Sequence, residues 1–262
     1  MLLSMTNPMT DTSTLTSIDQ LKVSDELRKD LAEFVSHLIE FYKGDLLSVT
    51  AFGSAVAGGY SETSSDLNLL VIYSDLNIAD LKGVAKLAQH WLKKRRFMPR
   101  FLSARNLANS ARYFQIDLME MRDAHVVLYG QDMLAEVKLC RSDLHWQLSH
   151  EIKRMRMRIK QQFWRTAGNA PVMQDILIHR FSSLLHLTRV LLYLEGKPAS
   201  SSPEAVAEAA VTELGIDVAF VRQMQALKSG ELKLKEDDQV NAFSRLMDTV
   251  RLVDERVDQV AV

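Results

Sequence analysis

The segment between residues 53 and 68 holds the residue types best suited to bind a phosphate. It begins with Gly53 and Ser54 directly after an apolar run, and it ends with Ser65, Asp66 and Asn68 at the start of another. A tight turn that exposes backbone N–H groups beside a hydroxyl is typical of anion-binding sites, and phosphate is their usual ligand. The sequence therefore predicts a phosphate-binding turn at Gly53 and Ser54.

An acidic residue faces the same place from the following strand. Asp66 and Asn68 are two residues apart, so in a strand their side chains lie on one face. Magnesium is bound in proteins through one or two carboxylates together with phosphate oxygens of the substrate. We therefore expect Asp66 to hold a Mg²⁺ ion that bridges the protein and a triphosphate.

The order of these residues resembles the nucleotidyltransferase superfamily, which includes DNA polymerase β and the kanamycin and streptomycin nucleotidyltransferases. The shared pattern is an apolar residue, Gly-Ser, a loop with glycine, and Ser-Asp-x-Asp before an apolar strand. The residues that match it are Gly53, Ser54, Gly58, Ser65, Asp66 and the run 69–73. The resemblance implies a mixed sheet flanked by helices, an NTP substrate, Mg²⁺, and transfer of a nucleoside monophosphate to a hydroxyl group. It also implies that Ser65 contacts the nucleotide together with Gly53 and Ser54.

One position departs from that pattern, because members of the superfamily carry a second carboxylate where this chain has Asn68. The resemblance implies that neighbouring carboxylates hold two Mg²⁺ ions, one on the triphosphate and one on the acceptor hydroxyl. An amide keeps an oxygen ligand but contributes no charge. Activity is then low, runs on a single metal ion, or depends on another carboxylate, for which Glu62 and Asp75 are the local candidates.

The resemblance also implies a third carboxylate on a later strand. Asp117 lies within an alternating apolar segment, residues 113–121, which predicts a strand. We therefore expect Asp117 to be the third catalytic acidic group and a metal ligand together with Asp66. The alternative is an exposed polar residue on a half-buried strand.

Basic residues are concentrated in one part of the chain. The whole chain has 32 Lys and Arg against 33 Asp and Glu, yet residues 91–165 have 16 against 7. Arg154 and Arg158 share a face of a predicted helix, away from its apolar stripe, and we expect them to bind the triphosphate or an anionic acceptor. A solvated helix surface is the simpler explanation of the same residues.

The elements that position these residues follow from hydrophobic periodicity. Strands are predicted at 45–52, 67–73, 98–102 and 113–121, and helices between Ser24 and Gly44 and over 78–96, with a loop that contains Asn106 and Asn109. From residue 142 helical periodicity dominates, which predicts a bundle of four or five helices. We predict a disordered N-terminus over 1–19, an α/β nucleotidyltransferase-like domain over 20–135, and a C-terminal helical domain over 142–262.

Composition excludes several other classes of protein. No apolar run approaches the roughly 20 residues of a membrane span, and the single Cys140 excludes an intramolecular disulfide and a cysteine-based zinc site. Residues 1–17 contain no Lys or Arg, unlike a signal peptide. We expect a cytoplasmic protein without a membrane partner, and without a nucleic-acid partner because the sequence shows no basic surface with interleaved aromatic residues.

Two functions from different classes fit these observations. The first is a nucleotidyltransferase that binds NTP and Mg²⁺ between its two domains and modifies a hydroxyl of a small molecule or a protein. The second is a catalytically degenerate protein of the same fold, acting as a nucleotide-binding or regulatory, partner-binding module, and Asn68 favours it. No pattern in the sequence identifies the base of the nucleotide, the acceptor or the oligomeric state.

Overall fold

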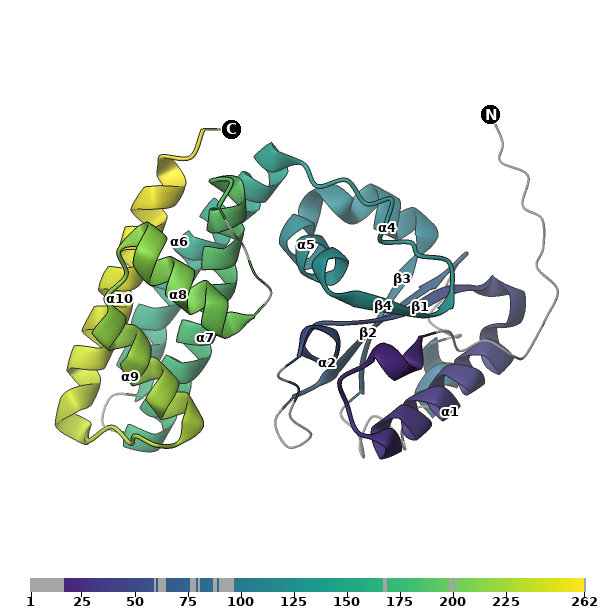
Figure 1. Cartoon of the computed structure of the whole chain (residues 1–262), viewed down its shortest axis with the longest axis horizontal. Coiled ribbons are helices and arrows are strands. Elements are labelled where there is room, and N and C mark those ends of the chain that lie inside the picture. Colours follow the sequence, from purple (N-terminus) through teal and green to yellow (C-terminus); the bar gives the residue numbers. More distant parts are fainter. Residues whose placement is uncertain are drawn as a thin grey trace. The chain divides into compact units, whose positions relative to one another are not determined.

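The chain forms two compact units, Met1–Lys138 and Leu139–Val262 (Figure 1). The structure is a computed structural model, and it describes residues 17–58, 60, 65–75, 79, 81–86, 89, 97–166, 169–197, 200 and 202–261. The first unit is a mixed sheet flanked by helices and the second is helical, which confirms the predicted fold class. Among the described residues, no helix is both long and apolar enough to cross a membrane.

A four-stranded sheet with the order β3-β2-β1-β4 lies at the centre of the first unit. Strands β1 (Leu46–Phe52) and β2 (Leu67–Tyr73) are antiparallel, β3 (Phe97–Ser103) is parallel to β2, and β4 (His125–Gly130) is antiparallel to β1. Strands β1 to β3 were predicted. The two interior strands, β1 and β2, are continuous apolar runs, as strands buried on both faces are, and β3 was predicted although it is an edge strand. The edge strand β4 was not predicted.

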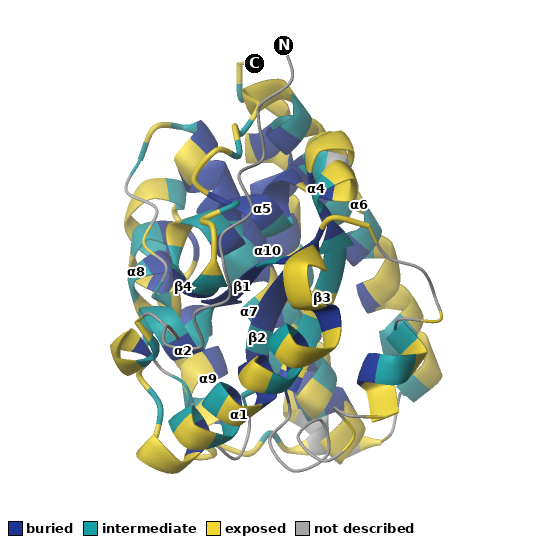
Figure 2. Ribbon diagram, turned by 90° about the vertical axis from the view of Figure 1, so that its right-hand side faces the viewer, coloured by how far each residue is buried: buried dark blue, intermediate teal, exposed yellow. Residues whose placement is uncertain are grey.

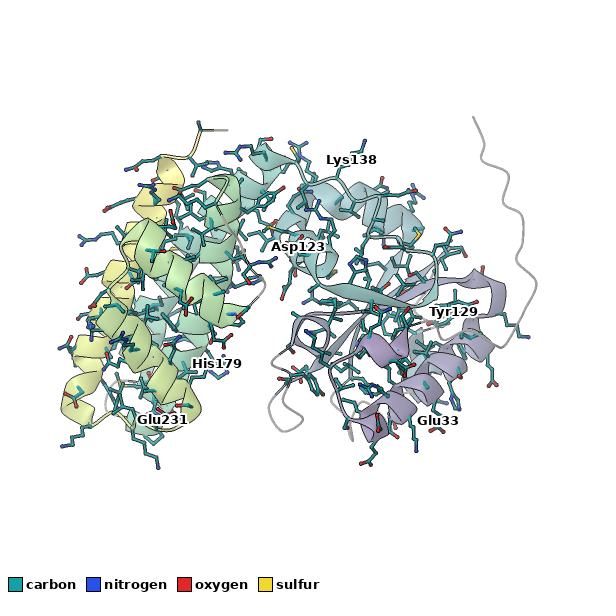
Figure 3. The ribbon with its side chains drawn as sticks, in the orientation of Figure 1. Glu33, Asp123, Tyr129, Lys138, His179 and Glu231 are labelled. Carbon is teal, nitrogen blue, oxygen red and sulfur yellow. The ribbon has the colours of Figure 1, made fainter. Side chains whose placement is uncertain are left out.

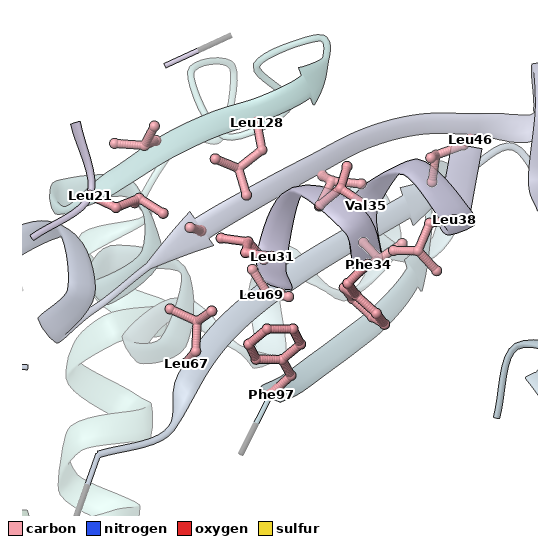
Figure 4. Packing of buried hydrophobic residues seen from close by; sticks show 14 of the residues in the cluster. Leu21, Leu31, Phe34, Val35, Leu38, Leu46, Leu67, Leu69, Phe97 and Leu128 are labelled. Carbon is pink, nitrogen blue, oxygen red and sulfur yellow. The ribbon is translucent and has the colours of Figure 1, made fainter. Parts of the chain in front are cut away.

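Helix α1 (Asp25–Tyr42) covers one face of the sheet. It begins at Ser24, whose hydroxyl accepts a hydrogen bond from the Leu27 N–H at 3.3 Å, as an N-cap does. Its buried stripe packs onto the strands in one hydrophobic core (Figure 4). In this core the centroids of the Phe34 and Phe97 rings lie 5.3 Å apart. This core fixes which residues of β2 and β3 point away from α1.

The other face carries two short helices that the sequence pattern did not predict. Helix α4 (Ala104–Ser110) replaces the expected loop with Asn106 and Asn109, and the hydroxyl of Ser103 caps it by accepting from the Asn106 N–H at 3.1 Å. A hydroxyl at this position offers the first turn a partner, which favours a helix over a loop.

Helix α5 (Gln115–Asp123) replaces the strand predicted over 113–121. Its buried apolar residues satisfy both a two-residue and a three-to-four-residue spacing, and so short a segment does not distinguish the two periods. The Leu118 N–H donates to the Phe114 carbonyl at 2.9 Å, which is the helical hydrogen bond. Asp123, labelled in Figure 3, ends the helix. The buried residues of α5 are Gln115, Ile116, Leu118, Met119 and Met121.

Two predictions fall largely on residues that the structure does not describe. Residues 1–16 of the predicted disordered N-terminus lie outside the described ranges, and Ile18–Gln20 form a 3₁₀ helix, η1. Of the helix predicted over 78–96, only residues 79, 81–86 and 89 are described, and they are helical.

The second unit is built from helices that begin at recognisable caps. Helices α6, α7 and α10 pack against one another, and α8 and α9 pack on α7 (Figure 1). Figure 2 shows that buried and exposed residues alternate along the helices. Side chains of Asn169, Ser202 and Asp217 cap the starts of α7, α8 and α9. The helices are α6 (Arg141–Thr166), α7 (Ala170–Leu194), α8 (Pro203–Leu214), α9 (Val218–Ser229) and α10 (Glu236–Asp258).

Candidate functional site

The predicted phosphate-binding turn lies at the end of β1. Gly53 has a φ of +81°, a conformation that L side chains rarely adopt. Its N–H donates to the Ala124 carbonyl at 3.1 Å, which ties the turn to the segment before β4. Ser54 then begins α2 (Ser54–Ala57), a single helical turn that packs against β1, β2 and β4.

Asn68 lies directly beside this turn. It is the register partner of Phe52, the residue before Gly53. A Cβ placed on Gly53 would lie 3.3 Å from the Asn68 Nδ2, so glycine is favoured there both by its φ and by the nearby amide. Ser65 and Asp66, both half-buried, precede β2 directly, whereas Glu62 lies outside the described residues. The structure therefore brings the turn and the start of β2 together.

The side chain of Asn68 lies on the sheet face opposite α1. Its neighbours Leu67 and Leu69 belong to the core beneath α1, and successive side chains of a strand alternate between faces. On β3, Phe97 belongs to the same core, so the alternation places Arg100 on the face of Asn68. Helix α5 supplies the partner of Arg100, which identifies this as the face that α5 covers.

Arg100 extends from β3 across β2 towards β1. Its Cζ lies 5.4 Å from the centroid of the Phe52 ring, and β2 lies between the strands that carry these two residues. The guanidinium therefore lies over β2, on the side of Asn68. It also donates to Oδ1 of Asp117 at 2.8 Å, and the two side chains are 46% and 39% exposed. Sequence reasoning did not single out Arg100.

The position of Asp117 corrects the sequence prediction. It lies on helix α5 and not on a strand, and it accepts a hydrogen bond from Arg100. The two later strands that the structure describes, β3 and β4, contain no Asp or Glu. The third carboxylate that the resemblance implies is therefore absent from both, and β3 presents a cation instead.

These residues do not fit a two-metal centre. Such a centre clamps two cations between carboxylates, whereas Asn68 is uncharged and Asp117 is already paired with Arg100. With Asp66 included, two negative charges and one positive charge leave −1, where three carboxylates would give −3. In the described part of the chain, no group of three His, Cys, Asp or Glu residues is placed to hold a metal ion. The side chain of Asp75 is exposed at the far end of β2 from Asn68.

A second polar group near the turn was also missed by sequence reasoning. His125 is the register partner of Phe52 on β4, and its Nε2 lies 3.2 Å from both oxygens of Asp132. Burial raises the pKa of Asp132, but hydrogen bonds from His125 and from the Ala135 and Leu134 N–H groups outweigh it and hold that pKa below its ordinary value. Both residues line a pocket of about 360 Å³, to which Ser17 and Gln20 at η1 also contribute.

The two arginines predicted to bind the triphosphate lie on α6, in the second unit. Arg154 forms an ion pair with Glu151 at 3.5 Å. Burial and the nearby charge of Arg158 together lower the pKa of Arg180. Their contact with a nucleotide stays a prediction, and the candidate site is described from the first unit alone.

Comparison with known proteins supports the fold. No protein-family model and no curated protein matches the sequence. Among solved structures, the chain is similar to the spectinomycin adenyltransferase AAD(9) from Enterococcus faecialis, solved with ATP and spectinomycin, with a TM-score of 0.58 and 13% sequence identity. The match covers 88% of this chain and 99% of that chain. At this identity the similarity shows the fold alone, and the fold of this chain is nucleotidyltransferase-like.

Proposed function

We propose that this chain binds the phosphate groups of a nucleotide through Arg100 and the Gly53–Ser54 turn, and that it does not carry out two-metal nucleotidyl transfer. This is the catalytically degenerate function that Asn68 favoured. The observation that carries the proposal is the guanidinium of Arg100 over β2, on the face of Asn68, where the family resemblance implies a carboxylate.

Arg100 offers a phosphate the positive charge that a metal ion would otherwise offer. A guanidinium binds phosphate through two parallel hydrogen bonds, and these bonds are stronger than neutral ones. The ion pair of Arg100 with Asp117 is about half exposed, and pairs of this kind contribute about 0–1 kcal/mol. Phosphate oxygens can therefore replace the carboxylate at little cost. Ser54 and Ser65 are the further phosphate contacts that we propose.

A transferase that uses one metal ion is the second candidate. It is favoured by the similarity of the fold to an adenyltransferase solved with ATP and by Asp66, since one carboxylate and the phosphate oxygens suffice to bind a single Mg²⁺. In that case Asp66 would hold the ion, and the acceptor would be a hydroxyl of a small molecule or a protein. The predicted cytoplasmic location is compatible with both candidate functions and does not distinguish between them.

Calorimetric titration of the full chain with ATP, GTP, CTP and UTP separates the two candidates. Each titration is run with Mg²⁺ and again with EDTA, and pyrophosphate release is followed in parallel. We expect at least one nucleotide to bind with similar affinity in both buffers, without release of pyrophosphate. Binding only with Mg²⁺, together with pyrophosphate release, would establish the second candidate. Failure of all four nucleotides to bind would refute both.

Two variants make the titration specific to the site. Arg100→Met is expected to weaken nucleotide binding at least tenfold, because it removes the proposed phosphate ligand. Arg28→Met is the matched control, since Arg28 also forms an ion pair, with Asp25 at 2.6 Å, but belongs to α1 on the opposite sheet face. Equal losses in both variants would mean that Arg100 acts through general charge or stability and not as a ligand.

A further inference from the structure

An exposed stripe of large side chains runs along α6 in the second unit. Trp146, Met157 and Trp164 are 62%, 66% and 80% exposed. These are high values for residue types that usually help to form a core. The buried residues of the same helix, among them Leu148 and Ile152, anchor it in the bundle.

Helical geometry places these side chains in one line. Met157 and Trp164 follow Trp146 by 11 and 18 residues, which at about 100° per residue returns them to within about 20° of its direction. His150, one turn after Trp146, stacks on that indole with a centroid distance of 5.5 Å and an interplanar angle of 6°. The stripe therefore presents flat aromatic surfaces at both ends, separated by about 27 Å along the helix.

Cations flank this aromatic stripe. Helix α6 contains seven Lys and Arg residues against two Asp and Glu, in a chain whose formal net charge is −1. Several of the cations are engaged within the bundle, as Lys153 is with Asp254 at 3.0 Å. Arg158, Lys160 and Arg165 are exposed, and none of them forms an ion pair with a residue that the structure describes.

The geometry points to a binding surface for single-stranded nucleic acid on α6. Unpaired bases stack on the indoles of Trp146 and Trp164, and the phosphates between them meet the cations Arg158, Lys160 and Arg165. Alternating stacking platforms and positive charge form the arrangement by which proteins bind single strands without reading their sequence. A span of about 27 Å suits the shorter single-strand sites, which begin at roughly four nucleotides.

Two other occupants fit the stripe less well. A helix that lies in a membrane surface needs a broad apolar face, whereas the positions between the tryptophans include the polar residues His150, Lys153 and Gln161. A base-paired duplex keeps its bases stacked on each other, which leaves the indoles without a partner. This inference departs from the expectation that the chain has no nucleic-acid partner, which depended on the absence of a basic surface with interleaved aromatic residues from the sequence pattern.

Fluorescence anisotropy with labelled U₁₂ and dT₁₂, titrated with the full chain at 50 and 200 mM salt, tests this surface. Three phosphate contacts predict a slope of log K against log[salt] near −2, and hence a loss of about 20-fold between the two salt concentrations. Trp146→Ala and Trp164→Ala should each weaken binding about tenfold, since each removes one stacking platform. Both side chains are exposed, so neither substitution opens the core.

Matched controls come from the same unit. Val240→Ala removes an exposed apolar side chain of α10 that is 57% exposed, and neutralising the exposed Arg222 and Lys233 removes charge away from α6. These variants should bind as the wild type does. The inference is overturned if neither oligonucleotide binds at 50 mM salt, if the tryptophan and control variants behave alike, or if polyglutamate or anionic vesicles bind as tightly as U₁₂. None of these outcomes depends on nucleotide binding in the first unit.

Discussion

Exchanging two side chains on the Asn68 face should turn this site into one that binds a divalent cation. The double substitution Asn68→Asp and Arg100→Met restores a carboxylate near Asp66 and removes the guanidinium. It also releases Asp117 from its ion pair. Methionine is long enough to keep a contact with the Phe52 ring, on which Arg100 now lies. The substitution therefore changes the charge of the site while leaving its packing filled.

Strand geometry sets the size of the expected effect. Adjacent strands lie about 4.8 Å apart and two residues span about 6.6 Å, so the Cα atom of Arg100, opposite Leu70 in the register, lies about 8 Å from that of Asn68. We take about 8 Å as the separation between the guanidinium and a metal ion at residue 68. Because the guanidinium is 46% exposed, an effective dielectric constant of about 40 is appropriate, and a divalent ion is then repelled by about 2 kcal/mol. Removing Arg100 should strengthen metal binding by about 30-fold.

Electron paramagnetic resonance of free Mn²⁺ measures this affinity directly. We expect the double variant to bind Mn²⁺ about 30-fold more tightly than Asn68→Asp alone. Adding Arg28→Met to Asn68→Asp should give no such gain, because Arg28 belongs to the helix on the opposite face. Equal Mn²⁺ affinity in the double variant and in Asn68→Asp would refute the reasoning, since Arg100 would then not lie near the metal position.

Three further predictions concern stability. The Tyr73 hydroxyl is buried without a hydrogen-bond partner among the described residues, so Tyr73→Phe should leave the free energy of unfolding unchanged or raise it by about 1 kcal/mol. Burial and the neighbouring Tyr42 raise the pKa of Tyr73, so its folded form stays protonated where the unfolded side chain ionises. Wild-type stability should therefore fall above about pH 10, and the fall should be smaller in Tyr73→Phe. Asp254 is buried between two cations, and Asp254→Ala should cost about 2–3 kcal/mol in urea unfolding, whereas the exposed Asp258→Ala should cost under about 1 kcal/mol. The lowered pKa of Asp132 contributes stability above about pH 4 that is lost as pH falls through the folded value, so unfolding of Asp132→Asn should depend less on pH in that acid range.

Sequence patterns predicted those elements whose burial is uniform. Strand β2 was predicted over 67–73, because a strand buried on both faces is a continuous apolar run and its ends are sharp. Helix α5 was predicted as a strand, since its apolar residues suit either period and the segment is short. Because of that error, Asp117 was assigned to a strand and was therefore expected to be the third carboxylate.

The two features that decide the proposals depend on three-dimensional geometry. Arg100 lies over β2 only because of the parallel register of β3 and the direction of its side chain towards Phe52. A lone arginine in an apolar segment gives no sign of this. The stripe between Trp146 and Trp164 lies on a helix that the sequence did predict, but the exposure of its side chains follows only from the way α6 packs in the bundle. The close approach of Gly53 and Asn68, by contrast, follows from a motif read along the chain.

The affinity for ATP in EDTA, compared between the wild-type chain and Arg100→Met, tests most directly whether an arginine has taken the role of a metal ion in this fold. We predict that wild-type binding persists without divalent cations and weakens at least tenfold on loss of the guanidinium. Wild-type binding that vanishes in EDTA, or an affinity that Arg100→Met leaves unchanged, would contradict the account.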